Sequence, residues 1–212
     1  MILYTWAPSL ASFRVRMALN LKGLVPEYRY VHLRRNGGEQ LTEDYARVNP
    51  LQAVPVLIDG RHTLTQSMAI LEYLEDTHPE PRLLPADPVA RARVRAVCEA
   101  VNSDIHPLGT PRVMRYLRGQ GFPDDRVRAW YPHWMREGLT RLDRMLADSA
   151  GRCCFGDAPT FADCFVIPQV YYARLQGVDL SSCNTLDRIW AHWSEHPAVM
   201  RALPSAQADW EG

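Results

Sequence analysis

The chain has 212 residues, of which 47% are hydrophobic and 23% are charged, so it is long enough to bury one sizeable core or two smaller ones. Basic and acidic residues both number 24. This zero formal net charge argues against a nucleic-acid binder, because such proteins rely on a basic excess to neutralise phosphates.

The first part of the chain predicts a strand followed by a helix. Residues 2–6 form a short apolar and aromatic run, and apolar side chains then recur at helical spacing between Leu10 and Leu21. Gly23 is placed to end that helix. No charged leader precedes the run, and no stretch of about 18 apolar residues occurs in the chain, so we expect neither export nor a membrane span.

The next segments continue the alternation of strand and helix. Residues 28–32 alternate as a strand does, and residues 41–48 suit a short helix. The segment 54–65 predicts a hairpin that turns at Asp59-Gly60, and a closing helix begins at Ser67. The order βαβαββα predicts a mixed sheet with helices packed on it.

Strand patterns almost vanish in the rest of the chain. Four prolines between His78 and Ala90 predict a linker, because neither a helix nor a central strand tolerates that density. Helical periodicity follows over 89–106 and 124–149, and a capping-box pattern at Thr160 opens a further helix. We therefore expect a first domain over residues 1–80, a linker over 81–90 and an all-helical domain over 91–212.

The five cysteines point to a reducing compartment. They are odd in number and lack CxxC spacing, which argues against a disulfide framework and against a zinc site. We expect a cytoplasmic protein without a metal.

Several motifs occur in an order that resembles a known family. Residues 9–23 read SLASFRVRMALNLKG, similar to SSCSWRVRIALALKG, the usual first-helix motif of zeta-class glutathione transferases. The remaining matches follow along the chain at Asn49-Pro50, Val54-Pro55, Gln66-Ser67, Pro168-Gln169-Val170, Arg174 and Val178-Asp179-Leu180. The chain thus resembles the zeta class of the glutathione transferase superfamily, which includes the isomerases of maleylacetoacetate and maleylpyruvate.

The resemblance implies a thioredoxin-like α/β domain (βαβαββα) followed by an all-α domain, with glutathione as cofactor. It also implies a homodimer that acts on a small diacid or another electrophile, without a nucleic-acid or membrane partner. A proline at position 55 matches the cis-proline of the family, which turns the backbone of Val54 outward to pair with glutathione. Gln66 and Ser67, at the start of a helix, would hold the γ-glutamyl carboxylate. Gln40 would contact the glycyl end.

The first-helix motif implies where the thiol is activated. Ser9 is the expected activating hydroxyl, because a hydroxyl donor at a helix N-terminus stabilises a thiolate. Ser12 is a second candidate catalytic hydroxyl. Ala11, Ser12, Phe13 and Arg14 fall on the glutathione-binding segment. The chain departs from the family motif at three positions. Leu10 stands where the motif has its second Ser, and Ala11 stands where it has Cys. Pro8 stands where an Arg often precedes the motif.

The second substrate of an isomerase carries two carboxylates, and arginine is the residue suited to bind them in pairs of hydrogen bonds. Arg112 and Arg174 match family arginine positions and are the candidate catalytic cations, Arg112 also lying on the glutathione-binding series. His106 and Thr110 match positions that reach glutathione across the dimer interface.

Three functions remain open from the sequence. The resemblance and the two arginines favour a glutathione-dependent cis–trans isomerase of a maleyl diacid. The replacements at Pro8 and Ala11 favour a general glutathione transferase that conjugates, dehalogenates or reduces peroxides. A non-catalytic binding protein of the same fold is the third reading, against which Ser9, Gln66 and Ser67 count.

Overall fold

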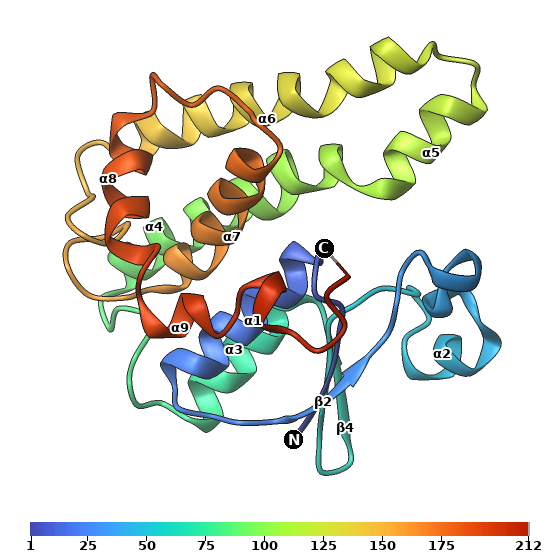
Figure 1. Ribbon diagram of the computed structural model, residues 1–212. Helices are drawn as coiled ribbons and strands as arrows, with labels where there is room; N and C mark the ends of the chain where they lie inside the picture. The colour runs from blue at the N-terminus through green and yellow to red at the C-terminus, as the bar shows by residue number, and fades with distance from the viewer. Residues whose placement is uncertain (212) are drawn as a thin grey trace. The chain divides into compact units, whose positions relative to one another are not determined.

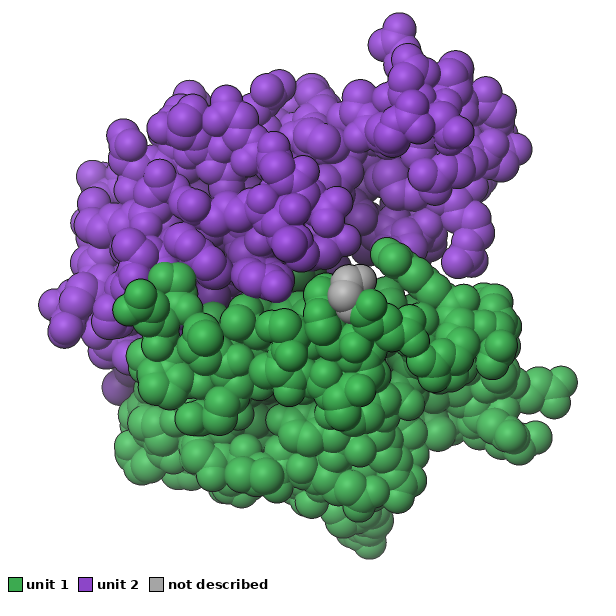
Figure 2. Space-filling view, in the orientation of Figure 1, with its two compact units in different colours: residues 1–82, 194–212 green, residues 83–193 purple. Residues whose placement is uncertain are grey.

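A computed structural model describes residues 1–211 of the chain. The chain forms two compact units, which Figure 2 distinguishes by colour. The first unit contains residues 1–82 together with the C-terminal segment from Ser194 onward, and the second contains residues 83–193.

The first unit has the predicted βαβαββα order, which is confirmed. Its elements are β1 (Ile2–Thr5), α1 (Leu10–Leu21), β2 (Glu27–Tyr30), α2 (Glu43–Val48), β3 (Val56–Asp59), β4 (His62–Thr65) and α3 (Ser67–Thr77). The strands form one sheet in the order β2-β1-β3-β4. Strand β1 is parallel to β2 and antiparallel to β3, and β3 and β4 form the predicted hairpin. Gly60 supplies the positive φ of +55° at its turn.

The strand directions bring several connections to one end of this sheet. Thr5 at the end of β1 pairs with Tyr30 at the end of β2, and Tyr4 lies opposite Val56 at the start of β3. Val56 in turn pairs with Thr65 at the end of β4. The segments that follow β1, β2 and β4, and the one that precedes β3, therefore share this end of the sheet.

The C-terminal segment packs on α1 (Figure 1). It contains the short helix α9 (Pro197–Met200). Asn20 of α1 donates its side-chain amide to the carbonyl of Ala198 at 2.9 Å, and Arg16 of α1 donates Nε to the carbonyl of Ala202 at 3.0 Å. The predicted helical domain, residues 91–212, includes this segment, whereas these hydrogen bonds attach the described part of the segment to the first unit.

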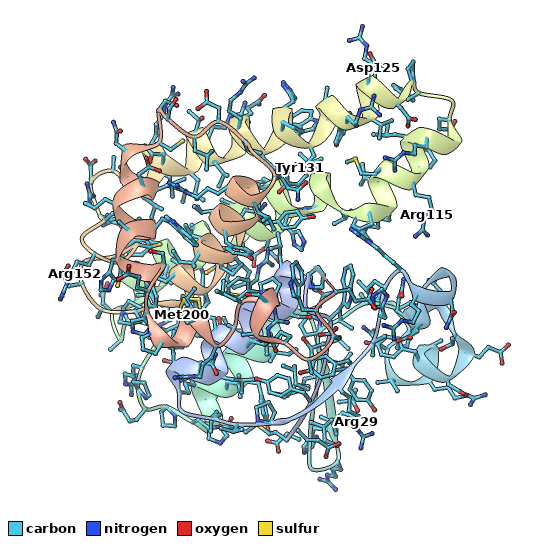
Figure 3. All side chains as sticks on the ribbon, viewed as in Figure 1. Arg29, Arg115, Asp125, Tyr131, Arg152 and Met200 are labelled. Atoms are coloured by element: carbon cyan, nitrogen blue, oxygen red, sulfur yellow. The ribbon has the colours of Figure 1, made fainter. Side chains whose placement is uncertain are left out.

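The second unit is helical, as predicted. Its helices are α4 (Pro88–Glu99), α5 (Pro111–Gly119), α6 (Asp124–Leu146), α7 (Phe161–Leu175) and α8 (Asn184–Trp193). A π-helical segment, Ala100–Ile105, and a 3₁₀ turn, His106–Gly109, connect α4 to α5. Tyr131 of α6 lies inside this unit, with its ring edge-to-face against Tyr172 of α7 at 5.7 Å (Figure 3).

Two prolines begin helices that the sequence analysis did not place there. Pro88 falls inside the predicted linker, yet it is the first residue of α4, where Asp87 caps the helix by accepting the N–H of Ala90 at 2.8 Å. Pro111 begins α5. Proline is tolerated at the first helical position because that N–H has no intrahelical partner. The predicted capping box is confirmed, since Thr160 and Asp163 bond reciprocally at the start of α7.

Candidate functional site

The end of the sheet described above carries most of the predicted glutathione-binding residues. Ser9 lies in the turn after β1, Gln40 in the segment after β2, Val54 just before β3, and Gln66 and Ser67 after β4. All of them belong to the first unit. The topology alone therefore gathers residues that lie up to 58 positions apart in the sequence.

Ser9 caps helix α1. Its Oγ accepts the N–H of Ser12 at 3.2 Å, and its carbonyl accepts the N–H of Phe13 at 2.9 Å. The N–H groups of Leu10 and Ala11 make no hydrogen bond within residues 1–211. The start of α1 thus presents two donors and the positive end of a helix dipole, an arrangement that stabilises an anion. Because Ser9 Oγ is an acceptor toward Ser12, its own proton is available to a further partner.

The other predicted binding residues of the first-helix motif are buried or half-buried. Ser12 and Phe13 are fully buried, and the Ser12 hydroxyl has no hydrogen-bond partner among the described residues. The Ser12 hydroxyl is covered by the surrounding described residues, so Ser9 is the better placed of the two candidate catalytic hydroxyls. Arg14 is also buried, but its Nη1 donates to Ser67 Oγ at 3.3 Å and so links α1 to the start of α3. Ala11 is half-buried.

Helix α3 begins with an exceptional backbone conformation. Gln66, the residue before it, has φ +69° and ψ 121°, a region that non-glycine residues rarely adopt. Gln66 makes no side-chain cap, and the N–H groups of Ser67, Met68 and Ala69 make no hydrogen bond within the described chain. Ser67 is therefore the first helical residue and not the cap, and its hydroxyl faces Arg14. A second unsatisfied helix N-terminus with a nearby guanidinium suits a carboxylate.

Val54 and Gln40 lie at two further connections. The Val54–Pro55 peptide is cis, as the resemblance implied. Neither the N–H nor the C=O of Val54 makes a hydrogen bond with another of the residues 1–211. Gln40 is buried, and its Oε1 has no partner in that part of the chain. Gly38, with φ +113°, leaves the space that the Gln40 amide fills, because a Cβ at this glycine would lie 2.7 Å from Gln40 Nε2.

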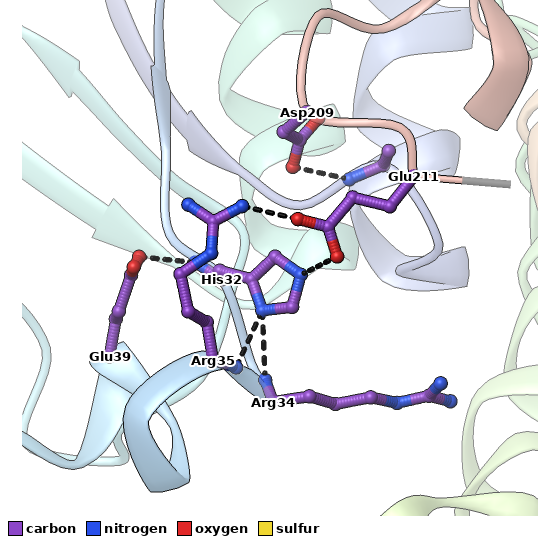
Figure 4. Close-up of polar contacts among 7 residues, drawn as sticks. His32, Arg34, Arg35, Glu39, Asp209 and Glu211 are labelled. Atoms are coloured by element: carbon purple, nitrogen blue, oxygen red, sulfur yellow. Dashed lines mark hydrogen bonds and ion pairs between the residues drawn. The ribbon is translucent and has the colours of Figure 1, made fainter.

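The sequence analysis missed a polar cluster at the same end of the sheet, drawn in Figure 4. Nδ1 of His32 accepts the backbone N–H groups of Arg34 and Arg35, and its Nε2 lies 3.2 Å from Glu211. Arg35 also pairs with Glu211 and lowers the pKa of that carboxyl. The Arg34 guanidinium lies over the Trp6 ring, 5.5 Å from its centre. The pair Arg34-Arg35, which begins two residues after the predicted strand 28–32, was the signal that could have indicated this cluster.

The remaining predicted residues belong to the second unit. Arg174 of α7 forms an ion pair with Asp187 of α8, and its guanidinium lies 5.8 Å from the centre of the Trp190 ring. Arg112 is exposed near the start of α5. Thr110 donates its hydroxyl to the carbonyl of Pro107 at 3.0 Å, and His106 is half-buried in the 3₁₀ turn.

Other features bear on what kinds of site the chain contains. All five cysteines are free thiols and buried. Burial raises the pKa of Cys153 to about 12, and it raises the pKa of Cys154 as well. Within residues 1–211, no three or more His, Cys, Asp or Glu side chains are grouped to hold a metal ion. None of the helices in that range has the length and apolar character needed to cross a bilayer.

Comparison with known proteins decides the family. Residues 1–76 match the family model described as "Glutathione S-transferase, N-terminal domain", and residues 135–201 match "Glutathione S-transferase, C-terminal domain". The chain belongs to the glutathione S-transferase family. The predicted fold class is thereby confirmed, and the relatives described next confirm the predicted resemblance to the zeta class.

Relatives of this glutathione S-transferase match over almost its whole length. The "Maleylacetoacetate isomerase" of Pseudomonas aeruginosa is 42% identical over 210 residues, covering 99% of this chain and 98% of the relative. A holo structure of maleyl pyruvate isomerase, described as a bacterial zeta-class enzyme, has 42% identity and a TM-score of 0.93, with 99% of both chains covered. A maleylacetoacetate isomerase structure from Methylobacterium extorquens AM1 "with bound malonate and GSH" has 38% identity and a TM-score of 0.94, with 100% of both covered.

Proposed function

We propose that this glutathione S-transferase is a glutathione-dependent cis–trans isomerase of a maleyl diacid such as maleylacetoacetate or maleylpyruvate. One observation carries the proposal. Two helix N-termini, those of α1 and α3, have N–H groups without a partner among residues 1–211, and they share one end of the sheet with the backbone of Val54, which is likewise unpaired in that range. The isomerase names of relatives at 42% identity, and the binding of GSH and the dicarboxylate malonate by a relative at 38% identity, support the reaction class.

The residues present fit glutathione. The N–H groups that begin α3, together with Gln66 and the Ser67 hydroxyl, suit the γ-glutamyl carboxylate, with the Arg14 guanidinium behind them. The free N–H and C=O of Val54 suit the cysteinyl backbone, in the manner of an added strand. The orphaned Oε1 of Gln40 suits a donor near the glycyl end.

The chemistry then divides between cofactor and protein. When bound, glutathione supplies a thiolate that adds reversibly to the cis double bond, which permits rotation and release of the trans isomer. The protein keeps that sulfur ionised at neutral pH, although a free thiol titrates near 8.5. The Ser9 hydroxyl donates to the sulfur, and the two free N–H groups of α1 add the field of the helix N-terminus. Ser12 has no part in this assignment because its hydroxyl is covered.

We assign the substrate carboxylates to arginines of the helical unit. Arg112 is exposed and Arg174 already binds a carboxylate, that of Asp187. A diacid that reaches Arg174 replaces Asp187 as its partner, which is an exchange of one charge-assisted hydrogen bond for another. His106 and Thr110 remain proposed glutathione contacts, and we propose that they act across a homodimer in the cytoplasm. Sedimentation at micromolar concentration tests the dimer, and a stable monomer near 24.2 kDa contradicts it.

The decisive experiment is incubation with glutathione and a maleyl diacid, following the trans product. We expect turnover that depends on glutathione. Ala11 and Pro8, where the zeta-class motif has Cys and Arg, favour the alternative of a general transferase. Turnover of a halonitrobenzene without turnover of either diacid supports that alternative. Saturable glutathione binding without turnover of either substrate class indicates a non-catalytic binding protein.

A further inference from the structure

The turn that carries Ser9 is held from two directions by side chains distant in the sequence. It runs from Trp6 to Ser9 and closes on itself, since the Ser9 N–H donates to the carbonyl of Trp6 at 3.0 Å. The conformation of this turn sets where the Ser9 hydroxyl and the first N–H groups of α1 lie. Whatever fixes the turn therefore fixes the proposed thiol-activating groups.

Arg16 holds the carbonyl side of the turn. This residue of α1 is fully buried, and its guanidinium donates to the carbonyls of Trp6 at 3.2 Å and Ala7 at 3.0 Å. It also donates to Thr5 Oγ1 at 2.9 Å and, as noted, to the carbonyl of Ala202. Burial lowers the pKa of Arg16 to about 10, so the group keeps its charge at neutral pH. Four hydrogen bonds compensate the loss of water around it.

Asp209 holds the N–H side of the same turn. Its Oδ2 accepts the N–H of Ala7 at 3.0 Å, a hydrogen bond between residues 202 positions apart. Its Oδ1 is buried and has no partner among residues 1–211. Burying a carboxylate oxygen without a hydrogen-bond partner destabilises the folded state, so Asp209 is not a solvated surface residue. Glu211 follows on the same tail but contacts His32 and Arg35 instead (Figure 4).

We propose that Asp209 is a positioning residue for catalysis, which fixes the turn before α1 so that the Ser9 hydroxyl and the free N–H groups of α1 keep the glutathione sulfur ionised. The inference rests on the proposed function, because it requires glutathione bound at the start of α1. The charged and titratable groups around the turn are Arg16, Tyr28, Tyr30 and Asp209, together with Arg34 and His32, which lie against the Trp6 ring. The negative charge of Asp209 opposes a thiolate, so this residue acts through the position of the turn and not through its charge.

The test measures the pKa of the enzyme-bound glutathione thiol, from the ultraviolet absorbance of the thiolate against pH, in four variants. Asp209→Ala removes the acceptor, and Asp209→Glu keeps the charge but displaces it. We expect both to raise the bound thiol pKa by about 0.5–1, a threefold to tenfold loss of thiolate well below that pKa. Asp209→Asn keeps an oxygen for Ala7 and should remain within about 0.3 of the wild-type value. Glu211→Ala is the matched control on the same tail and should also leave it unchanged.

Kinetics distinguish positioning from a general loss of structure. For Asp209→Ala we expect kcat to fall threefold to tenfold at a pH well below the wild-type pKa of the bound thiol, KM for glutathione to change less than twofold, and kcat to recover at higher pH as the thiol ionises. If Asp209→Ala does not fold, Asp209→Glu decides. Folded Asp209→Ala or Asp209→Glu protein with the wild-type thiol pKa overturns this inference alone. A wild-type chain without saturable glutathione binding overturns the proposed function, and this inference with it.

Discussion

Substitution of Ser67 by alanine should weaken glutathione binding without unfolding the protein. Ser67 is the first residue of α3, its side chain does not cap the helix, and its Oγ accepts one hydrogen bond, from Arg14 at 3.3 Å. The substitution therefore removes the proposed donor to the γ-glutamyl carboxylate without removing a cap. A hydrogen bond to a charged group contributes about 1.5–3 kcal/mol, which corresponds to about a tenfold to hundredfold rise in the Kd for glutathione.

Calorimetric titration measures that Kd, and thermal unfolding monitors the fold. Ser12→Ala is the matched control, because it deletes another buried serine hydroxyl of the same unit that has no partner within the described residues. We expect Ser12→Ala to leave the Kd within about twofold, a difference of about 0.4 kcal/mol. A folded Ser67→Ala protein that binds glutathione as tightly as the wild type refutes the assignment of α3 as the carboxylate site.

Three further predictions concern binding, turnover and stability. Gln66→Gly should relieve the backbone strain of a positive φ and raise the free energy of unfolding by about 0.5–1 kcal/mol, while weakening glutathione binding. Gln52→Gly, at φ +50°, should raise the free energy of unfolding without changing glutathione binding. Equal glutathione binding by both variants in calorimetry contradicts the role of Gln66. Arg174→Ala should lower kcat/KM for a maleyl diacid about tenfold or more but leave turnover of a halonitrobenzene unchanged. Asp187→Ala removes the competing carboxylate and should not lower diacid turnover. Equal losses of diacid turnover in both variants indicate that the ion pair is purely structural. The free energy of unfolding should fall as pH rises above about 8.5, because unfolded thiols ionise there while burial keeps Cys153 and Cys154 protonated in the folded protein. Urea titrations measure this fall, which should be smaller in Cys153→Ala.

The sequence predicted those parts of the fold that depend on local patterns. The hairpin at Asp59-Gly60 and the capping box at Thr160 follow from residues within a few positions of one another, and the structure contains both. The rule that proline breaks helices was misapplied at Pro88, which was placed in a linker but begins α4. The same residue type has opposite effects at the first position and in the interior of a helix, and periodicity alone does not locate that first position.

The candidate site was predictable where the resemblance supplied positions and unpredictable where partners are distant. Ser9, Val54 and Ser67 could be named because each lies beside a turn or a helix start. The partners of Arg16 and Arg174 could not, since they depend on tertiary contacts with Ala202 and Asp187. The two candidate hydroxyls, Ser9 and Ser12, could not be ranked from the sequence for a related reason. Helix α1 buries consecutive residues on several faces, so its pattern did not distinguish a ligand-facing hydroxyl from a covered one.

The attachment of the C-terminal segment to α1 has a consequence for biosynthesis. A ribosome completes residues 1–82 well before residues 194–211, so the strands and helices of the first unit emerge while Ala198, Ala202 and Asp209 are still unmade. Until those residues arrive, the Asn20 side-chain amide, Nε of Arg16 and the Ala7 N–H lack the acceptors that the finished protein provides. The nascent first unit therefore reaches its final hydrogen bonding only after the entire helical unit has been translated.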